Sequence, residues 1–180
     1  KALAAERVRD ETEKIMLTAA PDRVFELVRF GLLDAFLLKR AEYSQSFAAL
    51  RRIIKKPLER WVLLALILKE NNAINSVESF LTSTRLDSRT IRCGEDAGSI
   101  VEKAMPESPY QWKKLLNRYG VASVSCAVRC YDALHGGKKY NELKAVLKSG
   151  ECFSVKHLAI GGDELLELGL LKPQHTHLRL

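Results

Sequence analysis

Residues 58–69 form the segment that most restricts what this chain can fold into. The segment follows Pro57, and the eight residues from Trp61 to Leu68 are all apolar. Proline is favoured at the first position of a helix, and eight apolar residues fall well short of the roughly 20 needed to span a membrane. A helix that is apolar on nearly every side has to be surrounded by other protein elements. We therefore predict that this helix lies at the centre of its domain.

The remaining sequence also favours helices. Glycine and proline are sparse, at 10 and 5 of 180 residues, and no segment longer than a few residues alternates with the period of a strand. The fold class predicted is all-α, an elongated chain of helical hairpins. The predicted helices cover residues 2–17, 22–30, 32–42, 58–69, 109–119, 121–134 and 138–147, with one more ending at Leu81 and another near Met105.

Polar residues and glycines predict where several of these helices begin and end. Asn72 or Asn75 is expected to cap the helix that ends at Leu81, and Asp87 or Ser88 the next one. Ser108 followed by Pro109 is a typical pair for the cap and first position of a helix. Gly120 is expected to break that helix.

Catalytic and metal-binding patterns are not evident in the sequence. The four cysteines, Cys93, Cys126, Cys130 and Cys152, contain no CxxC pair, so buried reduced thiols and a cytoplasmic location are favoured over zinc binding. The sequence contains no glycine-rich phosphate loop, no nucleophile motif and no pair of aspartates in a D-x-D arrangement. We predict no catalytic residue, metal site or cofactor within this chain. Glu95 and Asp96 are interpreted as a solvated helix face.

Basic residues are the more informative polar feature, and the formal net charge is +7. They form three groups, and each suits the phosphates of a nucleic acid, although a solvated surface is the competing interpretation. Three aromatic residues beside the second group, Tyr110, Trp112 and Tyr119, are predicted to be core residues. The groups are Arg51, Arg52, Lys55 and Lys56; then Lys113, Lys114 and Arg118; and then Lys138, Lys139, Lys144, Lys148, Lys156 and His157.

Residues 153–170 predict two short helical turns joined through Gly161 and Gly162. Ser154 can cap the first turn, and Asp163 can begin the second. Paired glycines leave backbone N–H groups accessible, which suits an anion such as phosphate. A tight turn without a ligand is the alternative.

Two motifs, in order along the chain, resemble one family. Residues 5–11, Ala-Glu-Arg-Val-Arg-Asp-Glu, with Lys14, Pro21 and Gly31-Leu32-Leu33, are similar to the neck of bacterial tRNA nucleotidyltransferases. These are the CCA-adding enzymes and their poly(A) polymerase relatives. Residues 158–173, from Leu-Ala-Ile-Gly-Gly-Asp-Glu-Leu to Lys-Pro, resemble the tail motif of the same family. Gln174 stands where the family has glycine, and the tail looks shortened.

The resemblance implies a chain without the catalytic head of such an enzyme. It implies an end of the neck at residues 1–30, a helical body at 31–136 and a tail at 137–180. The head, with its magnesium ions and its CTP and ATP, would precede Lys1, so the chain is expected to be part of a longer protein. The implied partner is tRNA, with no membrane contact. Neck and tail do not separate CCA addition from poly(A) addition.

The sequence therefore leads to two functional hypotheses. The first is the tRNA-binding part of a CCA-adding enzyme, which holds the acceptor and T arms through shape and phosphate contacts. Its expected RNA-binding residues are Lys113, Lys114, Arg118, Lys138, Lys139, Lys144, Lys156, His157, Gly161 and Gly162. The second is a helical protein-interaction or regulatory module that does not bind RNA. An even mixture of lysines with acidic residues would favour the second.

Overall fold

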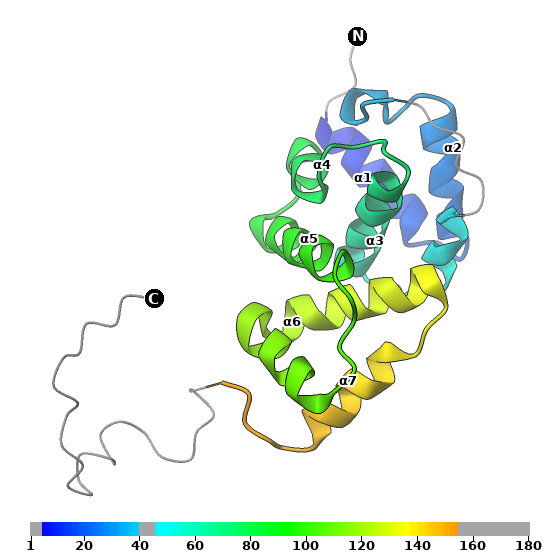
Figure 1. Ribbon diagram of the computed structural model, residues 1–180. Coiled ribbons are helices and arrows are strands. Elements are labelled where there is room, and N and C mark those ends of the chain that lie inside the picture. The colour runs from blue at the N-terminus through cyan, green and yellow to red at the C-terminus, as the bar shows by residue number, and fades with distance from the viewer. Residues whose placement is uncertain (1–4, 40–45, 155–180) are drawn as a thin grey trace, which may run out of the picture.

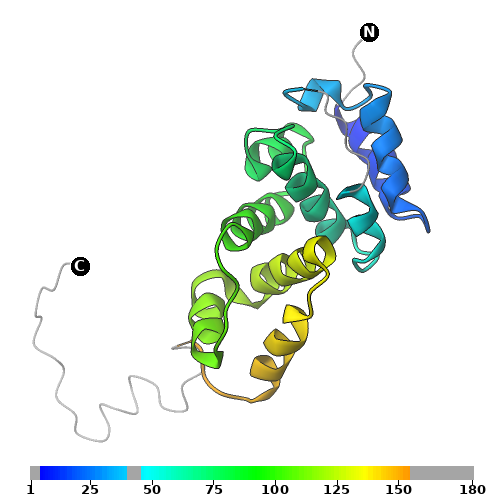
Figure 2. The ribbon, with the colours of Figure 1, turned by 45° about the vertical axis from the view of Figure 1, so that its right-hand side comes forward.

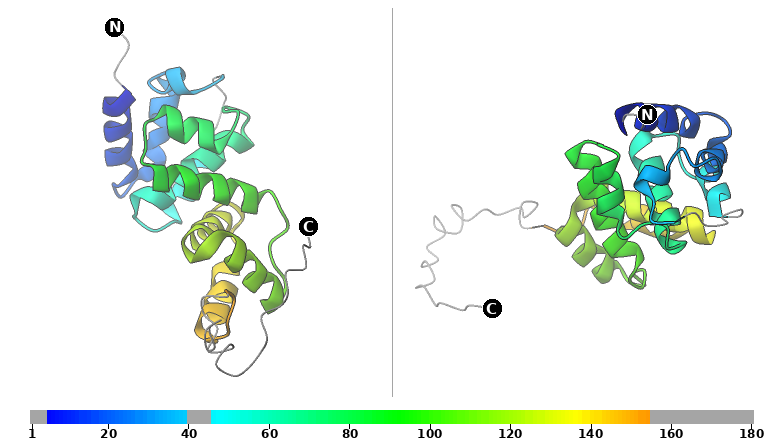
Figure 3. Two further views of the ribbon diagram at one scale, coloured as in Figure 1. Left: turned by 90° about the vertical axis from the view of Figure 1, so that its left-hand side faces the viewer. Right: turned by 90° about the horizontal axis from the view of Figure 1, so that it is seen from above.

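The computed structural model describes residues 5–39 and 46–154, and within these ranges it contains helices and loops but no strand. The prediction of an all-α fold is confirmed. The helices stack along one long direction, from α1 and α2 at one end to α7 at the other (Figure 2; Figure 3, left). The α-helices are α1 (Ala5–Met16), α2 (Val24–Arg29), α3 (Pro57–Glu70), α4 (Val77–Ser83), α5 (Ser88–Val101), α6 (Pro109–His135) and α7 (Lys139–Lys148). The 3-10 helices are η1 (Pro21–Arg23), η2 (Asp34–Phe36) and η3 (Ser46–Arg51).

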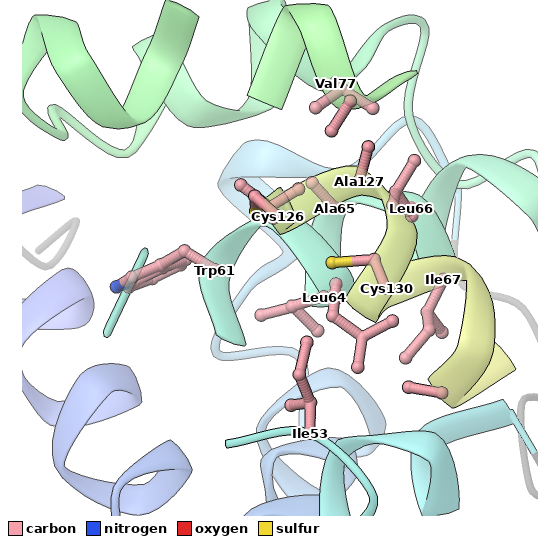
Figure 4. Packing of buried hydrophobic residues seen from close by; sticks show 14 of the residues in the cluster. Ile53, Trp61, Leu64, Ala65, Leu66, Ile67, Val77, Cys126, Ala127 and Cys130 are labelled. Atoms are coloured by element: carbon pink, nitrogen blue, oxygen red, sulfur yellow. The ribbon is translucent and has the colours of Figure 1, made fainter. Parts of the chain in front are cut away.

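Helix α3 is the central element, as its apolar sequence predicts. Every residue from Glu59 to Leu68 is buried, and α1, α4, α5 and α6 all pack against the helix. Its side chains face Val77 of α4 and the α6 residues Cys126 and Cys130 (Figure 4). The continuous apolar run is therefore explained by neighbours on all sides.

Two polar side chains of α3 hold α1 in place. The indole Nε1 of Trp61 donates a hydrogen bond to Glu13 Oε2 at 2.9 Å. Arg60 Nη1 donates to the carbonyl of Met16 and, at 3.4 Å, to that of Thr18. The last carbonyls of a helix have no partner within the helix, so the buried guanidinium satisfies groups that would otherwise lack one.

Several predicted helix boundaries are confirmed, and one is wrong. Asp87 caps α5 by accepting the N–H of Thr90 at 3.0 Å, and Ser108 caps α6 ahead of Pro109. The cap of α4 is Ser76, which forms a capping box with Ser79, and not Asn72 or Asn75. Asn72 instead adopts a φ of 56° in the turn after α3, a left-handed conformation that asparagine tolerates.

The predicted helix over residues 32–42 is also wrong where the structure describes it. Only the 3-10 turn η2 forms, and the backbone is extended at Leu37. The next N–H, that of Leu38, donates to the carbonyl of Ala73 at 2.8 Å. This long-range bond draws the chain against the end of α3, so the local helical preference is overridden.

Helix α6 consists of two helical segments that meet at Gly120, as predicted from the sequence. Gly120 has a φ of 77° and a ψ of 163°, which only glycine adopts readily. The two segments meet at an angle in Figure 1. The first segment carries the second basic group and buries Trp112 and Leu116, and the second segment supplies most of the buried residues of α6.

An aspartate of α6 fixes the start of α7. Asp132 accepts the backbone N–H groups of Lys139 and Tyr140, each at 2.9 Å, one on each carboxylate oxygen. Lys138, in the cap position, provides no side-chain cap. A residue seven positions upstream therefore performs the capping function and closes the α6–α7 hairpin.

The environments of the thiols agree with the prediction at three of four positions. Cys93, Cys126 and Cys130 are buried free thiols, whereas Cys152 is exposed, so its predicted burial is wrong. The neighbouring thiol of Cys126, together with burial, raises the pKa of Cys93, which therefore stays protonated at neutral pH. Asp96, expected on a solvated face, is instead half-buried and accepts the Ser123 hydroxyl hydrogen at 2.6 Å.

Candidate nucleic-acid interface

The two arginines of the first basic group form contacts within the fold. Arg51 forms a two-point ion pair with Asp22, with nitrogen-to-oxygen distances of 2.6 and 2.8 Å. This pairing lowers the pKa of the Asp22 carboxyl group. Arg52, which follows η3 directly, donates to the carbonyl of Ala133 at 3.2 Å and so connects this part of the chain to α6. These two arginines stabilise the body, and the remaining members, Lys55 and Lys56, are exposed.

Two members of the other basic groups also form ion pairs. Lys113 pairs with Glu151, and this contact lowers the pKa of Glu151. Lys139 pairs with Glu142 at 3.0 Å. Such pairs reduce the positive charge available to a partner. This arrangement is the mixture of lysine with glutamate that the protein-interaction hypothesis expects.

Lys114 and Arg118 are different, because no ion pair of either is found among the described residues. Both are exposed on the first segment of α6 and line a hollow of about 420 Å³ against the loop that follows α5. Lys103 lies on the same hollow and has no ion pair there either. We call this feature the α5–α6 hollow. Its lining residues are Lys103, Ala104, Met105, Pro106, Glu107, Gln111, Lys114, Leu115, Arg118 and Tyr119.

The wall of the α5–α6 hollow combines cations with an aromatic ring. The Arg118 guanidinium lies 5.1 Å from the ring centre of Tyr119, which is half-buried. Lys139 of the third basic group donates to the Pro106 carbonyl at 3.4 Å, at the edge of the same hollow. The fold therefore brings members of the second and third groups to one place, and Lys103, which was not predicted, joins them.

The prediction for the aromatic residues is only partly correct. Trp112 is buried in the core as expected, and Tyr119 is half-buried. Tyr110, however, is 73% exposed, so its assignment to the core is wrong. Tyr110 occupies the second position of α6, and its neighbours Pro109 and Gln111 are exposed as well.

The remaining predicted residues are on α7 or outside the described part. Lys138 is exposed just before α7, and the Lys144 ammonium lies 4.8 Å from the ring centre of Tyr140. Lys156, His157, Gly161 and Gly162 lie outside the described residues, as does the tail motif. The assignment of these ten residues as RNA contacts therefore stays a prediction.

A bent helical frame that carries unpaired cations and an aromatic ring around a hollow is a surface suited to a polyanion. Comparison with known proteins adds a more specific finding. Residues 1–43 match a family model described as the probable RNA and SrmB-binding site of polymerase A. The first part of the chain is therefore similar to the probable RNA-binding region of the poly(A) polymerase family. The matched residues contain the predicted neck motif. No curated protein and no solved structure matches the chain.

Neither α3 nor any other described helix has the length and apolar character that crossing a bilayer requires. Within residues 5–39 and 46–154, no three histidine, cysteine, aspartate or glutamate side chains gather as metal ligands would.

Proposed function

We propose that this chain is the RNA-binding part of a tRNA nucleotidyltransferase of the CCA-adding and poly(A) polymerase family. In this proposal residues 1–30 are the end of the neck, 31–136 the body and 137–180 the tail. The chain holds the acceptor and T arms of tRNA by shape and by phosphate contacts, and a separate catalytic head adds nucleotides. The match of residues 1–43 to an RNA-binding family model supports the RNA part of this proposal.

The observation that carries the proposal is the set of unpaired cations around the α5–α6 hollow. Lys103, Lys114 and Arg118 have no carboxylate partner in the described structure and face one exposed hollow. Cations that are already paired gain little from a phosphate, because the acid has to be displaced first. Unpaired cations at one place are therefore the best candidates for phosphate contacts. Lys138, Lys156, His157, Gly161 and Gly162 remain proposed contacts on the α7 and tail side.

The test is tRNA binding by the whole chain across a salt series from about 50 to 200 mM. We expect binding to weaken steeply as salt increases, because bound cations release counterions from the RNA. Replacement of Lys103, Lys114 and Arg118 with glutamine should flatten the dependence of log affinity on log salt by up to about 3, or roughly 1 per phosphate contact. Fluorescence anisotropy with labelled tRNA measures the affinity at each salt concentration and therefore also its salt dependence.

A matched control removes the same amount of charge from paired cations. Arg51, Lys69 and Arg85 are paired with Asp22, Glu102 and Glu6, respectively. Their triple glutamine variant changes the net charge by the same three units, and its salt dependence should stay close to that of the unmodified chain. Equal slopes for the two triple variants, or no tRNA binding at low salt, would contradict the proposal.

A second candidate function, contact with a protein partner, is favoured by apolar exposure near the N-terminal end. Of the six large apolar side chains that are exposed in the described residues, Phe30, Leu32 and Leu38 lie within nine positions. Leu32 also borders an apolar groove between α1 and α2, where the buried Thr12 hydroxyl has no hydrogen-bond partner. The family model that matches this region names SrmB as well as RNA.

Binding to purified SrmB tests this second function. Replacement of both Phe30 and Leu32 with serine should weaken the interaction by about tenfold or more, because a few well-packed residues carry most of the binding energy of such contacts. Serine at Val121, which is exposed on α6 far along the chain, is the control and should have no effect. Undetectable binding by the unmodified chain would rule out SrmB as the partner.

A further inference from the structure

A second hollow lies at the other end of α5 from the α5–α6 hollow. It has a volume of about 590 Å³ and is lined by the first residues of three helical segments. These are the start of α3, the start of α5, and Ala122 and Ser123 just after the break in α6. We call it the basic pocket. Its lining residues are Lys56, Pro57, Leu58, Glu59, Asp87, Arg89, Thr90, Arg92, Cys93, Ala122, Ser123, Ser125 and Arg129.

Four cations line the basic pocket, and three of them have no acidic partner. Lys56, Arg89 and Arg92 are exposed and form no ion pair within the described residues. The fourth, Arg129, is half-buried and pairs with Glu59 at 3.3 Å. The Nε of Arg129 is buried and has no hydrogen-bond partner in the described structure. Its other nitrogens donate to Glu59 and to the Tyr140 hydroxyl, so the Arg129 guanidinium is held in place at the wall of the pocket.

The two acidic residues of the pocket are already occupied by other donors. Glu59 accepts from Arg129, as described above. Asp87 accepts both the N–H and the hydroxyl of Thr90, at 3.0 and 2.7 Å, and these bonds lower the pKa of its carboxyl group. Neither carboxylate pairs with Lys56, Arg89 or Arg92. The pocket consequently has an excess of positive charge that its own acids do not neutralise.

The start of α3 adds backbone donors to the pocket. Lys56, in the cap position, provides no side-chain cap, and Pro57 has no N–H. The N–H groups of Leu58 and Glu59 precede the first helical hydrogen bond, which Arg60 donates to Lys56. The positive end of the helix dipole lies at the same place. An anion in the pocket would provide the cap that the sequence omits.

We propose that the basic pocket binds a phosphate group. The phosphate is a phosphodiester of the RNA backbone or a free inorganic polyphosphate, and the two share the chemistry that the pocket recognises. The RNA form rests on the proposed function. In that form the two hollows contact phosphates near the two ends of α5, whose 14 residues give a length of about 21 Å at 1.5 Å per residue. Two contacts at that separation set the line along which the RNA backbone crosses the body.

The test uses one position that changes the charge of the pocket without removing any cation. Ala122 is exposed, lines the pocket and follows the break at Gly120. A glutamate is favoured in the first turn of a helix, so Ala122→Glu should fold normally while it places a carboxylate among the cations. Ala122→Gln has nearly the same size and no charge, which makes it the matched control. The probes are tRNA and inorganic pyrophosphate, each titrated into the whole chain.

We expect Ala122→Glu to weaken binding of at least one probe by about tenfold, because a like charge at a phosphate site is strongly unfavourable, and Ala122→Gln to have little effect. A second variant, Arg89→Gln with Arg92→Gln, should weaken the same probe. Weaker binding of tRNA by the variants identifies the ligand of the pocket as a phosphate of the RNA backbone. Weaker binding of pyrophosphate alone identifies the ligand as a free anion. If tRNA binds and neither variant changes either probe, the pocket proposal is overturned while the proposed function stands. If tRNA does not bind but Ala122→Glu blocks pyrophosphate, the proposed function fails and the phosphate site remains.

Discussion

Replacement of Trp61 with alanine is expected to lower the free energy of unfolding by about 3–5 kcal/mol, the usual cost of removing a large aromatic side chain from a core. Trp61 is 1% exposed, and its ring centre lies 6.4 Å from that of Phe80. Its indole also donates the hydrogen bond to Glu13 that joins α3 to α1. The variant therefore loses packing against α4 and a polar contact with α1 at once. Urea unfolding followed by circular dichroism measures the change.

Tyr110→Ala is the control for Trp61→Ala. Tyr110 is the most exposed large apolar side chain of the described residues, and surface substitutions of this kind usually change stability by less than about 0.5 kcal/mol. Both variants remove an aromatic ring, so the difference between them reports the burial of Trp61 together with its hydrogen bond to Glu13. A loss below about 1 kcal/mol for Trp61→Ala would show that α3 is not the centre of the cooperative core.

Replacement of Arg60 with alanine should cost about 1–3 kcal/mol, the penalty for leaving the buried carbonyl of Met16 without its hydrogen-bond donor. Arg60 is 5% exposed, and burial lowers its pKa, although a guanidinium still keeps its charge at neutral pH. Without it, the carbonyls of Met16 and Thr18 lose their donor. The Thr18 carbonyl adds little to this cost, because Thr18 is exposed and water can replace the lost donor. Urea unfolding gives the total, and hydrogen exchange shows whether α1 amides open first.

Arg60→Met separates the hydrogen bonds of Arg60 from its packing. Methionine replaces most of the buried aliphatic volume but cannot donate to a carbonyl. If the hydrogen bonds dominate, Arg60→Met should recover only a minor part of the loss and the exchange of α1 amides should remain fast. Full recovery by methionine would mean that Arg60 acts through packing alone. The result matters for function because α1 belongs to the segment that matches the RNA-binding family model.

The element types followed from local patterns in the sequence. The apolar run of residues 61–68 required a surrounded helix, Asp87 and Ser108 marked helix starts, and Gly120 marked the break in α6. Each of these signals acts through the residue itself or within one helical turn, so it is readable without tertiary structure. Signals that depend on a distant partner were missed. The Leu38–Ala73 hydrogen bond ended the predicted helix over residues 32–42, and Asp132 capped α7 from another helix.

The basic residues also show this difference between local signals and contacts with distant partners. Their number and positions were evident from the sequence, but pairing depends on which acids the fold brings near. Arg51 pairs with Asp22, 29 positions away, and Lys113 pairs with Glu151, 38 positions away, so both cations are used in contacts within the fold. Lys114 and Arg118 form no ion pair in the described structure, and Lys103 lines the same α5–α6 hollow. No spacing rule in the sequence relates Lys103 to α6, because the loop from 102 to 108 sets that distance.

The sequence by itself determined an all-helical chain with α3 at its centre and a surplus of positive charge. It also contained the neck motif within the residues that match the RNA-binding family model. Only the tertiary structure decided which of those charges remain unpaired and where they gather. Helix formation depends on contacts within about one turn, whereas the availability of a cation depends on every acid within about 4–6 Å in space. The two hollows at the ends of α5 are consequently properties of the fold.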